Sequence, residues 1–467
     1  MPEREKKSLL IEGGTILTLD PSRRIIRNGA LLVEGKEISY VGKRSGLKRI
    51  PKRVRTISGE GKMVLPGLVN THMHLEYCGI VRGVADDVDL STFCNERVRP
   101  CEAVSTKEDA YISTLLACLD MVKTGTTCVC DTGGFHPESV AKAIQEIGMR
   151  ATIAHGSMDT SPPERPLVGS QRMATEENLR RSEELIRKWQ GGAGDRIRVR
   201  CSLRTLPNVS EELIFGLNEI AKRYRVGVNA HLSDTEQVVK AAERTRGYRE
   251  IEYLDHLGVL GPYWMGVHMV WLSDEEVKII KRRDMKVSHC PGAALHLGFG
   301  CTQAGKFVEM ATQGITVALS QDSTAANNSL DMFRSMYLLS IHKDARIDAT
   351  VFPPEKALEM ATLEGAKALL WEDEIGSLET GKKADIILID TKRPNWVPMH
   401  SFSIVPNLVY SGDGADVHTV IIDGSVVMEN RRIRTVDEDE ILRKAQRASE
   451  KVLKKAKVWP QSRWKIE

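Results

Sequence analysis

Short apolar runs alternate with longer amphipathic stretches from Pro66 onward. Eight runs have the character of buried strands, and they lie at residues 67–72, 126–131, 149–155, 197–203, 226–231, 265–270, 286–290 and 315–321. Strands that alternate with helical segments are typical of a parallel sheet with helical crossovers. Eight such units over about 300 residues match the size of a (β/α)8 barrel. We therefore predict an α/β fold with a TIM barrel at residues 66–372.

The two ends of the chain have a different pattern, in which short strands are separated by turns. Residues 8–65 are broken by pairs such as Gly13-Gly14 and Gly35-Lys36, and strand-like runs return after residue 383. Both regions have the turn residues between short strands that are expected of small β units. We predict that residues 1–65 and 373–467 build one β-sandwich beside the barrel, with a charged amphipathic helix near the C-terminus.

Length and charge restrict the kind of ligand. At 467 residues the chain can hold a large barrel and an accessory domain. Its 66 lysines and arginines nearly balance 63 aspartates and glutamates, which leaves a formal charge of +3. No run approaches the roughly 18 apolar residues of a membrane-spanning helix. We expect a small-molecule ligand, with no role for nucleic acid or a membrane.

The cysteines bear on the cellular compartment. Nine are scattered along the chain without a paired framework, which favours reduced thiols and a cytoplasmic location. Cys128 and Cys130 have a spacing that suits a metal site, but they lie in the strand-like run 126–131. A place in the hydrophobic core is favoured there over metal ligation.

Two histidines end the first barrel run. His72 and His74 are two residues apart in Pro-Gly-Leu-Val-Asn-Thr-His-Met-His, so a strand would direct both side chains to one side. Such a pair can bind one metal ion. Alone it is a weak signal, because polar pairs with this spacing also occur on surface strands.

Further polar residues end other runs. His231, His268 and Asp322 follow the fifth, sixth and eighth runs, and barrel enzymes carry their chemistry at the C-terminal ends of the strands. Each taken singly is more often a hydrogen-bonded rim residue than a ligand. Together with the first pair they predict a site of imidazoles and one carboxylate, which suits Zn²⁺, with Fe²⁺ or Mn²⁺ as substitutes. Such an ion activates water, so the site predicts hydrolysis.

Several motifs resemble one known superfamily. These motifs are Pro66 to His74, Arg82 to Asp87, His231 to Asp234, His268 to Leu272, His289 to Pro291 and Asn327 to Met332. They resemble the amidohydrolases, above all methylthioadenosine/S-adenosylhomocysteine deaminases and s-triazine hydrolases of the atrazine chlorohydrolase and melamine deaminase group. The likeness spans nearly the whole chain and includes Glu374 to Asp385.

This resemblance implies roles for individual residues. His72, His74, His231 and Asp322 would bind one divalent metal ion, His268 would orient the attacking water, and Asp322 would accept its proton. Relatives with two metal ions usually carry a carboxylated lysine on the fourth strand. Residues 196–204 contain no lysine, so we expect one ion per subunit. The resemblance also suggests a homo-oligomer, either a dimer or a tetramer.

The proton-shuttling residue departs from the family pattern. Related deaminases have a glutamate three residues after the third histidine, where this chain has Asp234. Hydrolysis of a ring amidine needs an acid that protonates a ring nitrogen. Asp234 is favoured as that acid over a structural aspartate, and Glu236 is a weaker candidate.

The substrate-reading positions also differ. Phe93 stands where relatives have tryptophan, and Arg204-Thr205 where they have Pro-His. We predict contacts with substrate from five residues that follow barrel runs. For His289 a packing role is equally compatible with the sequence, and Glu102 is expected to hold a loop. The five are Phe93, His155, Arg204, His289 and Asn328.

The combined prediction is a metal-dependent amidohydrolase that deaminates a nitrogen heterocycle such as a purine, pyrimidine, pterin or triazine. The expected chemistry is metal-hydroxide attack on an amidine carbon. One alternative is a triazine hydrolase that removes halide or alkylamine. The other is a degenerate barrel that acts as a binding or scaffold protein.

Overall fold

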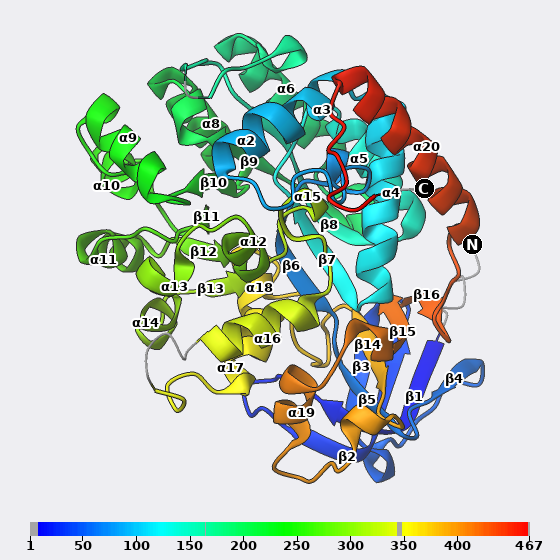
Figure 1. The fold of residues 1–467 in the computed structure, drawn as a ribbon. Helices are drawn as coiled ribbons and strands as arrows, with labels where there is room; N and C mark the ends of the chain where they lie inside the picture. Colours follow the sequence, from blue (N-terminus) through cyan, green and yellow to red (C-terminus); the bar gives the residue numbers. More distant parts are fainter. Residues whose placement is uncertain (1–7, 164, 343–347, 466–467) are drawn as a thin grey trace.

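A computed structural model describes residues 8–163, 165–342 and 348–465. This part of the chain forms a parallel barrel and, beside it, a mixed β-sheet (Figure 1). The predicted α/β fold with a TIM barrel and a separate β unit is confirmed. The chain leaves the mixed sheet at Pro66 and enters the barrel at Leu68.

Eight parallel strands of the described chain form the barrel, and their spatial order follows the sequence. Each overlaps one predicted run. Their bounds are β6 (Leu68–Met73), β7 (Thr126–Asp131), β8 (Arg150–Ser157), β9 (Ile197–Thr205), β10 (Val228–Leu232), β11 (Trp264–His268), β12 (Lys286–His289) and β13 (Val317–Leu319).

The contact between β13 and β6 closes the barrel. The Thr71 hydroxyl donates to the Leu319 carbonyl at 3.0 Å, and the Asp322 amide donates to the His72 carbonyl at 3.1 Å. Asn70 Oδ1 accepts from the Gln321 amide at 3.2 Å. Closure therefore places the end of β13 directly beside the two histidines of β6.

Helices surround the barrel (Figure 1). Several begin where the sequence supplies a capping side chain: Thr106 and Asp109 cap α4 in a reciprocal pair, and Ser273 and Glu276 do the same for α11. The outer helices include α4 (Lys107–Lys123), α5 (Pro137–Ile147), α6 (Thr175–Trp189), α8 (Glu211–Tyr224), α9 (Glu236–Arg246), α10 (Glu250–His256), α11 (Asp274–Arg283), α14 (Phe307–Thr312), α16 (Met332–His342), α17 (Pro354–Met360) and α18 (Leu363–Ala368).

Short helical segments follow the C-terminal ends of several strands. After β6 the chain forms α2, a π-helical turn at Phe93–Val98 and α3 without a break. π-Helical turns are rare and often occur at functional sites. The short helices are α1 (Leu75–Cys78), α2 (Leu90–Thr92), α3 (Arg99–Val104), α12 (Pro291–His296), α13 (Cys301–Ala304) and α15 (Thr324–Asn327).

Both ends of the described chain contribute to the mixed sheet, as predicted. β5 pairs with β14 in antiparallel register, from Lys62 opposite Asp390 to Pro66 opposite Ile386. Its strands are β1 (Ser8–Leu17), β2 (Ile25–Glu34), β3 (Glu37–Lys43), β4 (Val54–Ser58), β5 (Lys62–Pro66), β14 (Ile386–Asp390), β15 (Val417–Ile422), β16 (Ser425–Glu429) and β17 (Arg432–Ile433).

A buried ion pair joins the barrel to the mixed sheet. The Arg150 guanidinium at the start of β8 donates to both oxygens of Asp385, at 2.7 and 3.0 Å, and to Asp423 at 3.3 Å. Arg150 has no exposed surface, and Trp371 covers it with a ring centroid 4.8 Å away. The two units therefore share a rigid junction.

The C-terminal helix packs against the barrel wall. Helix α20 (Glu438–Ala456) runs along α4 and α3, and in Figure 1 it is the red helix beside α4. Its buried side chains are Ile441, Ala445, Ala448 and Val452. Helix α19 (Ile404–Tyr410) instead contacts α16 and α17.

Cys128 and Cys130 are buried in β7. Burial raises the pKa of Cys130 to about 12. Among the described residues, neither cysteine belongs to a group able to hold a metal ion, which agrees with the predicted core role. No helix in this part of the chain is long and apolar enough to cross a lipid bilayer.

Candidate active site

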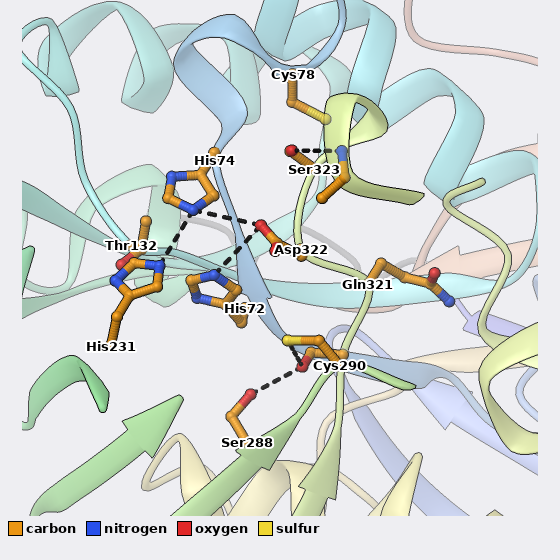
Figure 2. A network of polar contacts seen from close by, with 12 residues as sticks. His72, His74, Cys78, Thr132, His231, Ser288, Cys290, Gln321, Asp322 and Ser323 are labelled. Carbon is orange, nitrogen blue, oxygen red and sulfur yellow. Dashed lines mark hydrogen bonds and ion pairs between the residues drawn. The ribbon is translucent and has the colours of Figure 1, made fainter. Parts of the chain in front are cut away.

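Four histidines and one aspartate converge at the C-terminal ends of the barrel strands. His72 and His74 come from the end of β6 and Asp322 from the turn after β13; His74 Nε2 lies 3.4 Å and His72 Nε2 3.6 Å from Asp322 Oδ1. His231 Nε2 on β10 lies 3.2 Å from His74 Nε2. Figure 2 shows the side chains of His72, His74, His231 and Asp322 directed toward one another. The predicted residues are thus brought together in space.

Local backbone geometry directs two of these residues into the site. His268 and Asp322 have φ angles of 71° and 68°, a left-handed conformation that is unfavourable for residues other than glycine. Both stand where a strand ends and the chain turns. Strain of this kind is frequent at functional sites.

The residues present fit a divalent metal ion. Both ring nitrogens of His72 and the Nδ1 atom of His74 are buried without a hydrogen-bond partner in the described structure. Two overlapping groups, His72/His74/His231 and His72/His268/Asp322, each have ligand atoms within 4.8 Å of one another. Such a cluster of unsatisfied imidazoles is costly unless a shared ligand compensates it.

The protonation state of the imidazoles suits ligation. Burial, together with the positive Arg204, lowers the pKa of His74 well below its ordinary value, and burial lowers the pKa of His231 in the same direction. Burial also lowers the pKa of His268. Neutral imidazoles offer a lone pair to a cation.

A backbone group orients one of the histidines. Nδ1 of His231 is within hydrogen-bond distance of the Arg204 carbonyl on the neighbouring strand β9. A proton on Nδ1 would fix the tautomer and leave the Nε2 lone pair directed at the cluster, as is usual for metal-binding histidines.

Asp234 lies on the wall of the same cavity. Its Oδ1 accepts from the Thr235 amide at 2.8 Å, and its Oδ2 is 3.5 Å from Arg165 Nη2. Behind it, Glu250 at the start of α10 is fully buried and accepts from the Ser233 amide. Burial and the nearby Asp234 raise the pKa of Glu250 to about 8. The second carboxyl therefore holds a proton at neutral pH.

The cavity has a narrow inner part and a wide outer part. The inner part, about 80 Å³, includes four of the five convergent residues; the outer cleft, about 970 Å³, extends over α8, α9 and α10. Both parts are lined by Leu90, Cys94, Arg165 and Leu297. The inner cavity and the outer cleft therefore adjoin at these four residues.

The predicted substrate contacts fall into two groups. Phe93 and Arg204 line the inner cavity. His289 stacks on Phe307 with a centroid distance of 3.5 Å, and His155 Nε2 lies 3.2 Å from Asn178 Oδ1. Asn328 donates to Asp86 Oδ1 at 2.6 Å. His155, His289 and Asn328 do not line the inner cavity or the cleft.

Sequence reasoning missed several residues of the cavity wall. Glu102, expected only to hold a loop, accepts from Gln171 Nε2 at 3.0 Å and pairs with Arg204 at 2.8 Å, while it also lines the inner cavity. Arg99 and Arg165 line it too. These residues come from the helical segments after β6 and from the loop after β8, where no periodic pattern marks them.

Comparison with known proteins finds one matching family model and several similar deaminases. The model of the amidohydrolase family matches residues 63–427. The chain is 34% identical over 449 residues to a 5'-deoxyadenosine deaminase of Methanosarcina acetivorans, covering 96% of this chain and 99% of that protein. It is 33% identical over 449 residues to a 5-methylthioadenosine/S-adenosylhomocysteine deaminase of Thermoanaerobacter pseudethanolicus, with 96% and 100% covered.

Solved structures include a similar fold. The crystal structure of an adenosine deaminase from Xanthomonas campestris with bound zinc superposes with a TM-score of 0.89 at 27% identity, and the match covers 96% of this chain and 99% of that one. The resemblance proposed from the sequence motifs is confirmed.

Proposed function

The chain belongs to the amidohydrolase family, and we propose that it removes an amino group hydrolytically from an adenosine-type heterocycle. Its activity is that of a hydrolase acting on carbon–nitrogen bonds of cyclic amidines. The observation that carries the proposal is the convergence of His72, His74, His231 and Asp322 on a cavity that also contains Asp234. A ligand set and a separate acid are the two components that amidine hydrolysis requires.

We propose one zinc ion as the metal, held by His72, His74, His231 and Asp322. The unpartnered ring nitrogens and the zinc bound to the Xanthomonas enzyme support this choice. When bound, such an ion lowers the pKa of a water molecule and so supplies a nucleophile near neutral pH.

The chain's own side chains manage the protons. Asp322 accepts the proton of the attacking water, and His268 beside it hydrogen-bonds that water. Asp234 donates a proton to a ring nitrogen, so that the ring carbon can accept the hydroxyl group. Asp322 then passes that proton to the amino group, which leaves as ammonia, while the hydroxyl proton returns to Asp234 and the ring carbon becomes a carbonyl.

A scaffold protein without activity is less compatible with the site. Buried imidazoles without partners destabilise a fold unless they bind something, and a mere scaffold has no reason to keep them. The single ion per subunit, the cytoplasmic location and the homo-oligomer stay predictions.

The proposal is tested with two variants that separate the ion from the acid. His231→Ala should lose both the bound metal and ammonia release, because one of four ligands is gone. Asp234→Asn should keep near-stoichiometric metal but lose at least about 100-fold in kcat, because the proton donor is gone. Adenosine and 5'-deoxyadenosine serve as substrates, and metal content is measured alongside.

The control is His256→Ala, since His256 is exposed, stacks on Tyr248 and lines neither the inner cavity nor the cleft. It should leave both readouts unchanged. Full activity of metal-free His231→Ala, or no ammonia from any amino heterocycle by the metal-loaded wild type, would overturn the proposal.

A further inference from the structure

Glu250 is a buried carboxyl group that the proposed reaction does not use. It begins α10 and has no exposed surface, and its Oε2 accepts from the Ser233 amide. Its Oε1 has no hydrogen-bond partner in the part of the chain that the structure describes. A carboxyl group taken out of water in this way costs folding free energy, which the bond to Ser233 only partly offsets. The stability of the fold therefore gives no reason for a carboxyl group here.

A neighbouring carboxyl group has very different surroundings. Glu276 on α11 is equally buried. Its oxygens accept from the Ser273 amide at 2.8 Å, from Arg249 Nε at 2.7 Å and from the Ile251 amide at 3.3 Å. These bonds hold the residues on both sides of Glu250 against α11. Glu276 thus has the contacts of a structural carboxylate, whereas Glu250 extends from a fixed point of the backbone toward Ser233.

The hydrogen bond of Glu250 falls on a strained turn. Ser233 has a φ angle of 52°, in the left-handed region that costs free energy in residues other than glycine. Its carbonyl accepts from the Val270 and Trp271 amides, both at 2.9 Å. The chain after β11 therefore holds one side of the turn, and Glu250 holds the other. Such a conformation persists only where its surroundings impose it.

Asp234 follows this turn directly, and the turn decides where its carboxyl group lies. Oδ1 accepts from the amide of the next residue, Thr235, at 2.8 Å, and Oδ2 is 3.5 Å from Arg165 Nη2. The first contact moves with the turn, and the second is longer than an ordinary hydrogen bond. Asp234 is also one methylene group shorter than the glutamate of related deaminases. It therefore has less freedom to reach a ring nitrogen from a displaced backbone.

We propose that Glu250 is a positioning residue for the deamination, which holds the Ser233 turn so that the Asp234 carboxyl group reaches the ring nitrogen. This inference rests on the proposed function and adds a residue to it. Burial and the nearby Asp234 raise the pKa of Glu250 to about 8, so at neutral pH it places no second negative charge beside the acid. Misplacement of a reacting group by about 1 Å can cost about 100-fold in rate.

The first experiment removes the acceptor for the Ser233 amide and keeps the volume of the side chain. In metal-loaded enzyme with adenosine or 5'-deoxyadenosine, Glu250→Met should lower kcat by about 10- to 100-fold, while KM and metal content stay close to the wild-type values. Glu250→Asp should show a similar loss, because its carboxyl group is one methylene group too short for the amide. Glu250→Gln keeps an acceptor and should retain most of the wild-type kcat.

Glu252→Met is the matched control, because it makes the same substitution on the same helix at a half-buried residue that lines neither the inner cavity nor the cleft. Its kcat should equal that of the wild type. Circular dichroism checks the fold, and Glu250→Asp decides if Glu250→Met does not fold. An unchanged kcat, or an equal loss in Glu250→Gln, would overturn the inference and leave the proposed function intact. No ammonia from the metal-loaded wild type would overturn both.

A double-mutant cycle separates the positioning of Asp234 from a general disturbance of the cavity. Asp234→Asn removes the proton donor, so adding Glu250→Met to it should lower the residual kcat by less than about 2-fold. If Glu250 only supported the cavity wall, Glu250→Met would lower kcat by the same factor in both backgrounds, because independent effects add. Equal factors would therefore overturn the inference.

Discussion

Glu250 shows how one buried carboxyl links the site to the stability of the fold. Its Oε2 accepts from the Ser233 amide, while Oε1 has no hydrogen-bond partner in the described structure. The folded chain keeps the Glu250 proton up to about pH 8, whereas an unfolded chain releases it near pH 4.5. Between these values the folded state binds more protons, so this group makes the free energy of unfolding fall as pH rises.

Glu250→Gln should remove that loss, because a glutamine keeps an acceptor for Ser233 and has no proton to release. Relative to wild type, the variant should gain stability steadily from pH 5 to pH 8. The slope for a fully retained proton is roughly 1.4 kcal/mol per pH unit. Chemical denaturation at several pH values measures it. The control is Glu212→Gln, an exposed change on α8, whose free energy of unfolding should depend on pH as that of the wild type does. If the free energy of unfolding of Glu250→Gln also had the wild-type pH dependence, the prediction would be refuted.

At the scale of elements, the predictability of the site depends on periodicity. His72, His74, His231, His268 and Asp322 were found because each ends an apolar run, and a closed parallel barrel brings such ends to one rim. The observed strands begin and end a few residues away from the predicted runs. An apolar run reflects which residues are buried, whereas the ends of a strand depend on backbone hydrogen bonds.

The substrate side of the cavity follows no such rule. Arg99 and Glu102 are one helical turn apart on a segment that passes from a π-helical to an α-helical turn. Arg165 lies in an irregular loop, and its guanidinium approaches Asp234, a residue distant in sequence. Their place depends on tertiary contacts between segments distant in sequence, which no local pattern encodes.

The junction between the two units gives a prediction at this scale. Arg150→Met should cost about 3–5 kcal/mol of folding stability, because Asp385 would be left buried without its cation. Denaturation of the metal-loaded protein measures the loss. The matched control is Lys36→Met, which removes a half-exposed partner of Asp423 and should cost below about 1 kcal/mol. Equal losses would mean that burial of the Arg150 pair is unimportant.

At the scale of the whole molecule, the metal should stabilise the protein. The histidines come from β6, β10 and β11 and the aspartate from the end of β13, so an ion bound there links strands around the barrel. A ligand present at 100 times its Kd adds about 2.7 kcal/mol to the free energy of unfolding.

Chelation should therefore lower the Tm, and adding back Zn²⁺, Mn²⁺ or Fe²⁺ should restore it, most fully for the ion that the site prefers. His231→Ala should show a much smaller response to each ion. Differential scanning fluorimetry with matched chelator concentrations gives the comparison. A wild-type Tm that changes neither with chelator nor with added metal would contradict a metal site that spans the barrel.

The pairing of β5 with β14 has a consequence for how the chain is made. The ribosome releases β5 before the whole barrel, and β14 only after it. Until then, one edge of an apolar strand has unpaired backbone groups, and open edges of this kind invite wrong partners. The nascent protein thus exposes an aggregation-prone edge at the strand that later joins its two units, and a chaperone that shields Met63 to Leu65 would protect it during synthesis.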